Sequence, residues 1–146
     1  MKSKIIKILL VVFIAIQAFR IDKTNPQAAK ELDFISINKP SKDITQLLKA
    51  SCYDCHSNES KYPWYSNVAP VSWFLKHHID EAREEVNFSE WGSFSEKRKA
   101  KKIEEIIEEV EEGEMPMTPY VMMHSEAKMS KAQRETFIKY FKSLAH

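Results

Sequence analysis

The sequence predicts an all-α fold. Only two glycines occur among its 146 residues, and the charged residues lie in long runs that suit helices rather than in the alternating pattern of strands. Beyond residue 40, apolar residues recur every three or four positions, as on the buried face of a helix. The length suits one compact domain with a short appendage, so we expect about four helices around a single core.

The first 20 residues have the pattern of a secretory signal. Three lysines precede an apolar run from residue 8 to 16, and Arg20 closes the segment. The run is shorter than the roughly 20 residues that span a bilayer comfortably, so a cleaved signal peptide and a short membrane anchor both stay open. Cleavage after Ala18 would place Ile16 where a small residue is preferred, which favours retention as an anchor.

The rest of the chain is mildly acidic. The sequence has 22 basic and 21 acidic residues, and residues 1–20 hold four of the basic residues and none of the acidic ones, which leaves a formal charge of −3. A nucleic-acid-binding domain normally has a basic face, so we exclude nucleic acid as a partner. We expect export to the periplasmic side of the membrane.

Composition divides the chain into three segments. Residues 21–40 are polar, contain two X-Pro steps and show no sustained period, which predicts a linker after residues 1–20. Residues 41–146 then form the domain. Its first helix follows Ser41, a residue that caps helices well, and leads directly to Cys52.

Three further helices follow in the domain. We expect them at residues 70–87, 93–113 and 130–144. The second of these begins with a Ser-x-x-Glu capping-box pattern at Ser93 and ends at Gly113, a residue type common just after a helix. Residues 114–128 contain two prolines and therefore cannot form one regular helix.

One five-residue motif points to a specific chemistry. Cys52 and Cys55 are the only cysteines, they are three positions apart, and His56 follows the second. Covalent haem attachment needs two thiols one helical turn apart for two vinyl groups, and a histidine beside them for the iron. The motif predicts one haem c attached through Cys52 and Cys55, with His56 as the proximal iron ligand.

Three other interpretations use the same residues. A dithiol oxidoreductase usually has this motif at a helix start within a βαβ unit, and no strand pattern precedes Cys52. A structural zinc site needs a second pair of ligands, and no further cysteine exists. A simple structural disulfide is the third interpretation.

The iron position opposite His56 needs a methionine or imidazole ligand if the protein transfers electrons. The available side chains are Met115, Met117, Met122, Met123, Met129, His77, His78, His124 and His146. Met115 stands out because it follows the helix end at Gly113 and precedes Pro116, which restricts its backbone. In an extended loop Met117 would point to the opposite side. We expect Met115 as the distal ligand, with Met117 as the runner-up.

Four aromatic residues are candidates for a haem pocket. They are Trp64, Tyr65, Trp73 and Trp91. Their rings suit the wall of a half-exposed cofactor and their N–H and O–H groups suit its propionates, although plain core packing explains them equally well. We also expect a backbone carbonyl near Pro63 to accept the Nδ1 proton of His56, because metal-bound histidines usually have such a partner.

Short motifs are spread over most of the chain, from roughly residue 25 to 144. They are Asn25-Pro26, residues 52–58, 63–66, 69–73, 87–91 and 113–116, Tyr120 and His124. Together they resemble the bacterial haem-binding domain family of small, single-haem, cytochrome c-like proteins with an N-terminal hydrophobic segment. The resemblance implies covalent haem c with His56 as a ligand and Met115 in the methionine position. Family members often have proline after the Met-Pro pair, where this chain has Met117.

The resemblance also implies electron transfer with redox partner proteins of the cell envelope. We therefore expect a one-electron carrier with no substrate chemistry. Two alternatives from other classes stay open. A peroxidase-like haem enzyme needs an open iron position and an acid–base group, for which His124 is available, and a redox or gas sensor needs an axial ligand that can leave.

Overall fold

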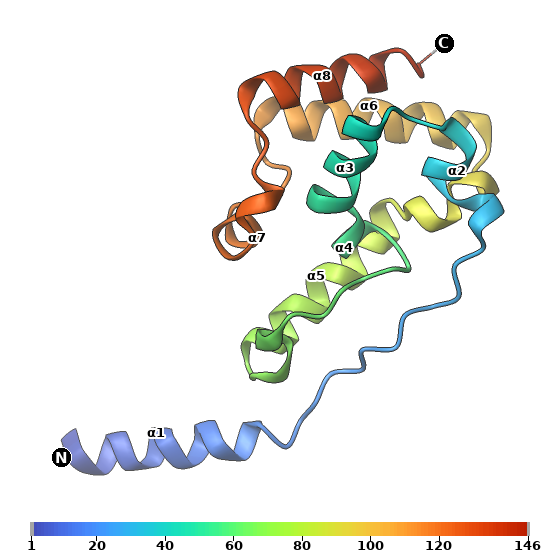
Figure 1. The fold of residues 1–146 in the computed structure, drawn as a ribbon. Coiled ribbons are helices and arrows are strands. Elements are labelled where there is room, and N and C mark those ends of the chain that lie inside the picture. The colour runs from blue at the N-terminus through green and yellow to red at the C-terminus, as the bar shows by residue number, and fades with distance from the viewer. Residues whose placement is uncertain (1, 146) are drawn as a thin grey trace.

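The computed structural model describes residues 2–145, and all regular secondary structure within that range is helical, which confirms the all-α prediction (Figure 1). The elements are α1 (Lys2–Ile16), η1 (Lys30–Leu32), α2 (Phe34–Asn38), α3 (Lys42–Ser51), α4 (Tyr53–His56), η2 (Trp64–Asn67), α5 (Val71–Glu85), η3 (Phe88–Ser93), α6 (Glu96–Glu112), α7 (Thr118–Met123), η4 (Ser125–Ala127) and α8 (Lys131–Lys142), where η denotes a 3₁₀-helix. The four predicted helices correspond to α3, α5, α6 and α8.

Local signals explain where several of these helices begin and end. The Ser41 hydroxyl accepts a hydrogen bond from the backbone N–H of Ile44, and Ser130 forms a reciprocal capping box with Gln133. Gly113 has the left-handed φ of 86° that ends α6. The predicted cap at Ser93 is wrong, because residues 88–93 form η3 and α6 starts two positions later, capped by Ser95.

The core lies where α3, α6 and α8 meet η3. Helices α6 and α8 run side by side, and α3 lies beneath them (Figure 1). Aromatic rings fill the centre: Phe34 packs against Trp91 and Phe141 with ring centroids 4.9 and 5.5 Å apart, and Tyr53 stacks on Phe88 at 5.4 Å. These contacts place α4 directly beside the core.

The linker ends earlier than the sequence predicts. Residues 34–38 form α2, whose N-terminus is capped by the Asp33 carboxylate, and Phe34 is fully buried. Glycine at position 92 permits the close approach of residues 32–37 to η3, because a Cβ there would lie 3.0 Å from the backbone Cα of Leu32 and 2.9 Å from Ile37 Cδ1. Phe34 therefore belongs to the core, although it precedes the expected domain start at residue 41 and its helix is too short to show a period.

Replacing Phe34 with alanine tests this boundary. We expect a loss of about 3–5 kcal/mol in the free energy of unfolding, because a large buried ring is removed from a packed site. Ile37→Ala is the matched control on the same helix, since Ile37 is 41% exposed and should lose much less. Denaturant titration measures both, and equal losses would contradict the assignment of Phe34 to the core.

Most of helix α1 projects away from the rest of the fold, and an extended segment leads from its C-terminal end toward η1 (Figure 1). None of its residues is buried, and its large apolar side chains are exposed. Among residues 2–145, no helix is both long enough and apolar enough to cross a membrane.

Candidate functional site

A cavity of about 450 Å³ opens between α4, α5, α6 and the chain that follows α6. This volume is within the range of small-molecule and cofactor sites. Its lining includes Cys52, Cys55 and His56 from the junction of α3 and α4, and Met115 and Met117 from the chain after α6. Residues separated by some 60 positions in the sequence thus face the same space.

The thiols and the imidazole reach the cavity because α4 follows α3 almost without a loop, with only Cys52 between them. The backbone N–H of Cys52 donates to Leu48 at the end of α3, and the N–H of His56 donates to the carbonyl of Cys52 at 2.9 Å. This short helical turn sets Cys52 and Cys55 one turn apart with His56 beside them. All three predicted residues of the motif therefore line one site.

The imidazole of His56 is held in one orientation. Its Nδ1 lies 2.9 Å from the carbonyl oxygen of Ala82 and 3.2 Å from that of Val86, so Nδ1–H donates to the C-terminal end of α5. Burial lowers the pKa of His56 and favours the neutral ring. In that tautomer Nε2 has a free lone pair, and within the described chain no hydrogen bond occupies it. A metal ligand requires this state.

The expectation of an Nδ1 partner near Pro63 is wrong. The carbonyls belong to Ala82 and Val86, because α4 packs against the last turn of α5. Carbonyls at a helix end have few intrahelical donors and are available to a side chain.

The environment of both cysteines favours the protonated thiol. Burial raises the pKa of Cys52 to about 12 and that of Cys55 to about 11, and neither forms a disulfide. Reactive thiols of dithiol oxidoreductases have lowered pKa values, so the environment here is of the opposite kind. Within residues 2–145, no three histidine, cysteine, aspartate or glutamate side chains gather as a metal site.

The backbone N–H and the backbone carbonyl of Met115 are both hydrogen-bonded. The N–H of Met115 donates to the backbone carbonyl of Glu109 at 3.0 Å. Arg134 Nη1 donates to the carbonyl of Met115 at 3.4 Å and also to that of Val110. Arg134 extends from α8 and satisfies carbonyls at the C-terminal end of α6, where a cation is electrostatically favoured. The thioether of Met115 is thus presented by a restrained backbone.

Comparison with family models decides the kind of cofactor that this arrangement serves. Residues 11–143 match the model described as a haem-binding domain. The chain belongs to the haem-binding domain family. Searches among curated proteins and among solved structures returned no match.

The residues of this haem-binding domain fit the cofactor that its family implies. An imidazole with a free Nε2 and two thiols on the same wall match the needs of covalent attachment and proximal ligation. The remaining walls are largely apolar, with Val86, Phe88, Ile106 and Phe137 among them, as suits a flat aromatic macrocycle.

The methionines of the haem-binding domain do not lie as an extended loop would place them. Met115 and Met117 both line the cavity, so the expectation that they point to opposite sides is wrong. The chain bends at these positions and α7 starts at Thr118, which replaces the alternation of extended backbone with a compact turn. Met122 and Met123 are 80% and 55% exposed and lie outside the cavity, and Met129 is buried in the core.

The other histidines have different partners. His77 is exposed and lies 3.3 Å from Glu81, while His78 lines the cavity rim with its Nδ1 close to the carbonyl of Phe74. His124 is not among the lining residues, and its Nε2 lies 2.8 Å from the Tyr65 hydroxyl. His146 lies outside the described residues.

None of the four aromatic residues predicted for the haem pocket is among the residues that line the cavity. Trp91 is buried in the core, and Trp64 is 71% exposed. Tyr65 is bonded to His124, and the indole N–H of Trp73 donates to the carbonyl of Phe19. The polar groups of Tyr65 and Trp73 thus form hydrogen bonds with residues that are distant in the sequence.

Sequence reasoning missed the charged rim of the cavity. Lys102 is largely buried there and lies 2.6 Å from Glu105 and 3.2 Å from Glu85. Tyr120 also lines the site and donates to Asp54 at 2.8 Å. A signal existed for the lysine: Lys102, Glu105 and Glu109 recur at helical spacing beside the apolar stripe of α6 and therefore border the same face.

Proposed function

We propose that this haem-binding domain holds one haem c covalently through Cys52 and Cys55 and acts as a one-electron carrier in the cell envelope. The observation that supports it most is the orientation of His56. Two backbone carbonyls fix its Nδ1 proton and leave Nε2 as the free nitrogen, and His56 lines the same cavity as both cysteines, Met115 and Met117.

In this proposal each residue has one task. Cys52 and Cys55 form the two thioethers, His56 Nε2 is the proximal iron ligand and Met115 Sδ is the distal one. The bound haem supplies an iron that cycles between ferric and ferrous states. The carbonyls of Ala82 and Val86 keep the imidazole oriented, and Arg134 restrains the backbone that presents Met115.

A carrier is favoured over a haem enzyme by the position of the acid–base candidate. His124 does not line the cavity, and its Nε2 is engaged by the Tyr65 hydroxyl. Two methionines share the cavity lining with His56, and a six-coordinate iron suits electron transfer rather than substrate binding. The redox partners in this proposal are other proteins of the cell envelope.

One pair of spectra tests this function. Ferric and ferrous absorption are recorded with and without carbon monoxide on protein matured in a host that attaches haem c. We expect a low-spin spectrum that carbon monoxide leaves unchanged, because a methionine fills the sixth position. Immediate carbon monoxide binding by the ferrous wild type would instead favour a sensor or a peroxidase-like enzyme.

We further propose that the domain is exported and stays on the outer face of the membrane through residues 1–20. The support is the basic start followed by an apolar run, which is typical of export signals. Fractionation of cells that make the untagged protein should place it with the membranes. A soluble periplasmic protein with a mature N-terminus near Phe19 would show that the segment is a cleaved signal.

A further inference from the structure

Large apolar side chains are exposed at the end of the domain where η2 meets the first turn of α5. They are Trp64 (71% exposed), Val71 (47%), Trp73 (39%) and Phe74 (53%), which we call the aromatic corner. Single exposed apolar residues are common, but several on adjoining elements indicate an interaction surface.

The N-terminal segment is fastened to this corner. The side-chain amide of Gln17 donates to the carbonyl of Ala69 at 3.0 Å and accepts from its N–H at 2.9 Å. The indole N–H of Trp73 donates to the carbonyl of Phe19 at 2.9 Å. Three hydrogen bonds thus place the C-terminal end of α1 against the aromatic corner.

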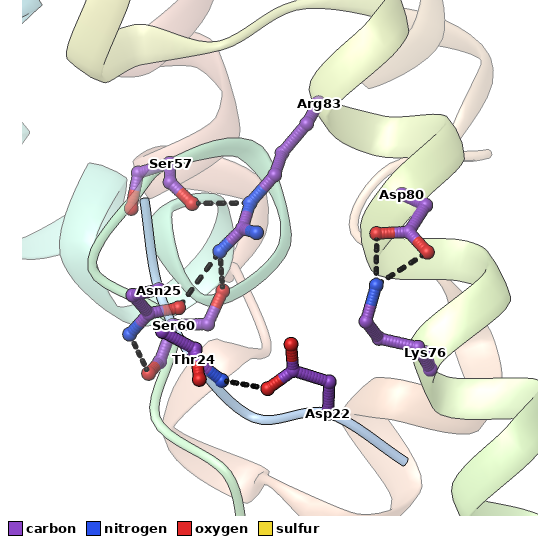
Figure 2. A network of polar contacts seen from close by, with 8 residues as sticks. All are labelled: Asp22, Thr24, Asn25, Ser57, Ser60, Lys76, Asp80 and Arg83. Carbon is purple, nitrogen blue, oxygen red and sulfur yellow. Dashed lines mark hydrogen bonds and ion pairs between the residues drawn. The ribbon is translucent and has the colours of Figure 1, made fainter. Parts of the chain in front are cut away.

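The segment between α1 and the core forms a second set of hydrogen bonds to the domain, at Asn25. Figure 2 shows Arg83 of α5 donating to the Ser57 carbonyl, the Asn25 side chain and the Ser60 hydroxyl, at 2.8, 2.8 and 2.9 Å. Asn25 in turn donates to the carbonyl of Ser60. Because residues 17–25 are bound along the domain, α1 leaves it at the aromatic corner and not at an arbitrary point.

The side chains of α1 indicate what lies next to that corner. None is buried against the domain, and its large apolar residues are 45–65% exposed, from Phe13 to Ile6. Isoleucine, leucine, valine and phenylalanine follow one another without a polar face from residue 8 to 16, whereas a helical partner needs only one apolar stripe. Lysines at positions 2, 4 and 7 suit anionic headgroups.

We propose that the aromatic corner is a lipid-contacting surface that rests among the headgroups of the membrane to which α1 binds. Tryptophan and other amphipathic rings are enriched at this depth, and Trp73 shows the arrangement, with its N–H bonded and part of its ring exposed. The cavity lies toward the other end of α5, a helix of about 22 Å, so soluble partners can still reach it. The inference rests on the proposed envelope location.

Lipid photolabelling tests this surface. Holoprotein is bound to vesicles of phosphatidylethanolamine and phosphatidylglycerol that contain a lipid with a diazirine near its headgroup, then irradiated, digested and analysed by mass spectrometry. We expect adducts on α1, Trp64 and Phe74. Ile37 is the internal control because it is 41% exposed on α2, far from α1 (Figure 1). Adducts on α1 without adducts on Trp64 and Phe74, or equal labelling of Ile37, would overturn the proposal.

Paired variants give a second measurement. Trp64→Ser with Phe74→Ser should weaken vesicle binding about tenfold in flotation, since binding scales with buried apolar area, and Ile37→Ser should not. Unchanged binding of the double variant would overturn the proposal, and chain-to-chain cross-links at the corner without lipid adducts would assign it to a second copy. The haem spectrum of each sample reports separately on the proposed redox function. A protein cleaved near Phe19 that still labels at the corner would refute only the anchor.

Discussion

Replacing both Cys52 and Cys55 with alanine should leave little stable holoprotein. Without thioethers the haem is held only by its axial ligands, and the cavity of about 450 Å³ loses its permanent occupant. Apolar walls left without their occupant lose packing contacts and are exposed to water, which lowers stability. The margin of a small domain is only about 5–15 kcal/mol, so such a loss matters.

The measurement is the yield of haem-containing protein per cell and its thermal midpoint. A matched control is the double variant Met122→Ala with Met123→Ala, which removes two exposed side chains outside the cavity and should keep the wild-type yield. A cysteine-free protein that accumulates with a full complement of haem would contradict the covalent assignment.

Replacing Met115 with alanine should change the iron site without unfolding the domain. We expect loss of the ferric methionine–iron charge-transfer band, a lower reduction potential and carbon monoxide binding by the ferrous protein, because thioether ligation raises the potential and blocks the sixth position. The backbone contacts that restrain the loop, from Met115 N–H to Glu109 and from Arg134 to the Met115 carbonyl, do not need the side chain.

Met117→Ala is the control that distinguishes loss of the iron ligand from loss of an apolar side chain in the cavity. Both methionines line the same cavity, so the two variants remove similar apolar contacts and differ in the ligand. Met117→Ala should keep the charge-transfer band. An unchanged Met115→Ala spectrum, with the three changes appearing in Met117→Ala, would identify Met117 as the ligand.

The helices were predictable where the signal is local. The hydroxyls of Ser41 and Ser130 and the left-handed Gly113 act within three or four residues of themselves, so capping rules correctly placed the starts of α3 and α8 and the end of α6. The prediction of Ser93 as the cap of α6 failed because two serines, at 93 and 95, precede the same helix. Burial of Trp91 in η3 accompanies the later start, and burial is not a local property.

Helices of only a few residues cannot be recognised from the spacing of their apolar residues, because they are too short to show a repeat. Helix α2 has five residues, and only the packing of Phe34 against Phe88, Trp91 and Phe141 shows that it belongs to the core. The polar composition around Phe34 predicts a linker, and residues 21–29 form no helix in the structure.

The motif of the candidate site was visible in the sequence, but its surroundings were not. Two cysteines and a histidine identify themselves by spacing alone. The carbonyls that orient His56 come from residues 26 and 30 positions later, and Trp73 finds its acceptor 54 positions earlier. Such partners depend on how α4 packs on α5 and on where the N-terminal segment binds, which no local pattern encodes.

Extraction with acidic acetone tests the central claim most directly. The wild-type protein is matured in a host that attaches haem c, denatured in the solvent and separated from it, and the polypeptide is weighed by mass spectrometry. Thioethers at Cys52 and Cys55 should keep the haem on the chain, which should be heavier than its sequence by the mass of one haem. Haem recovered in the solvent, with a polypeptide of unmodified mass, would contradict covalent attachment.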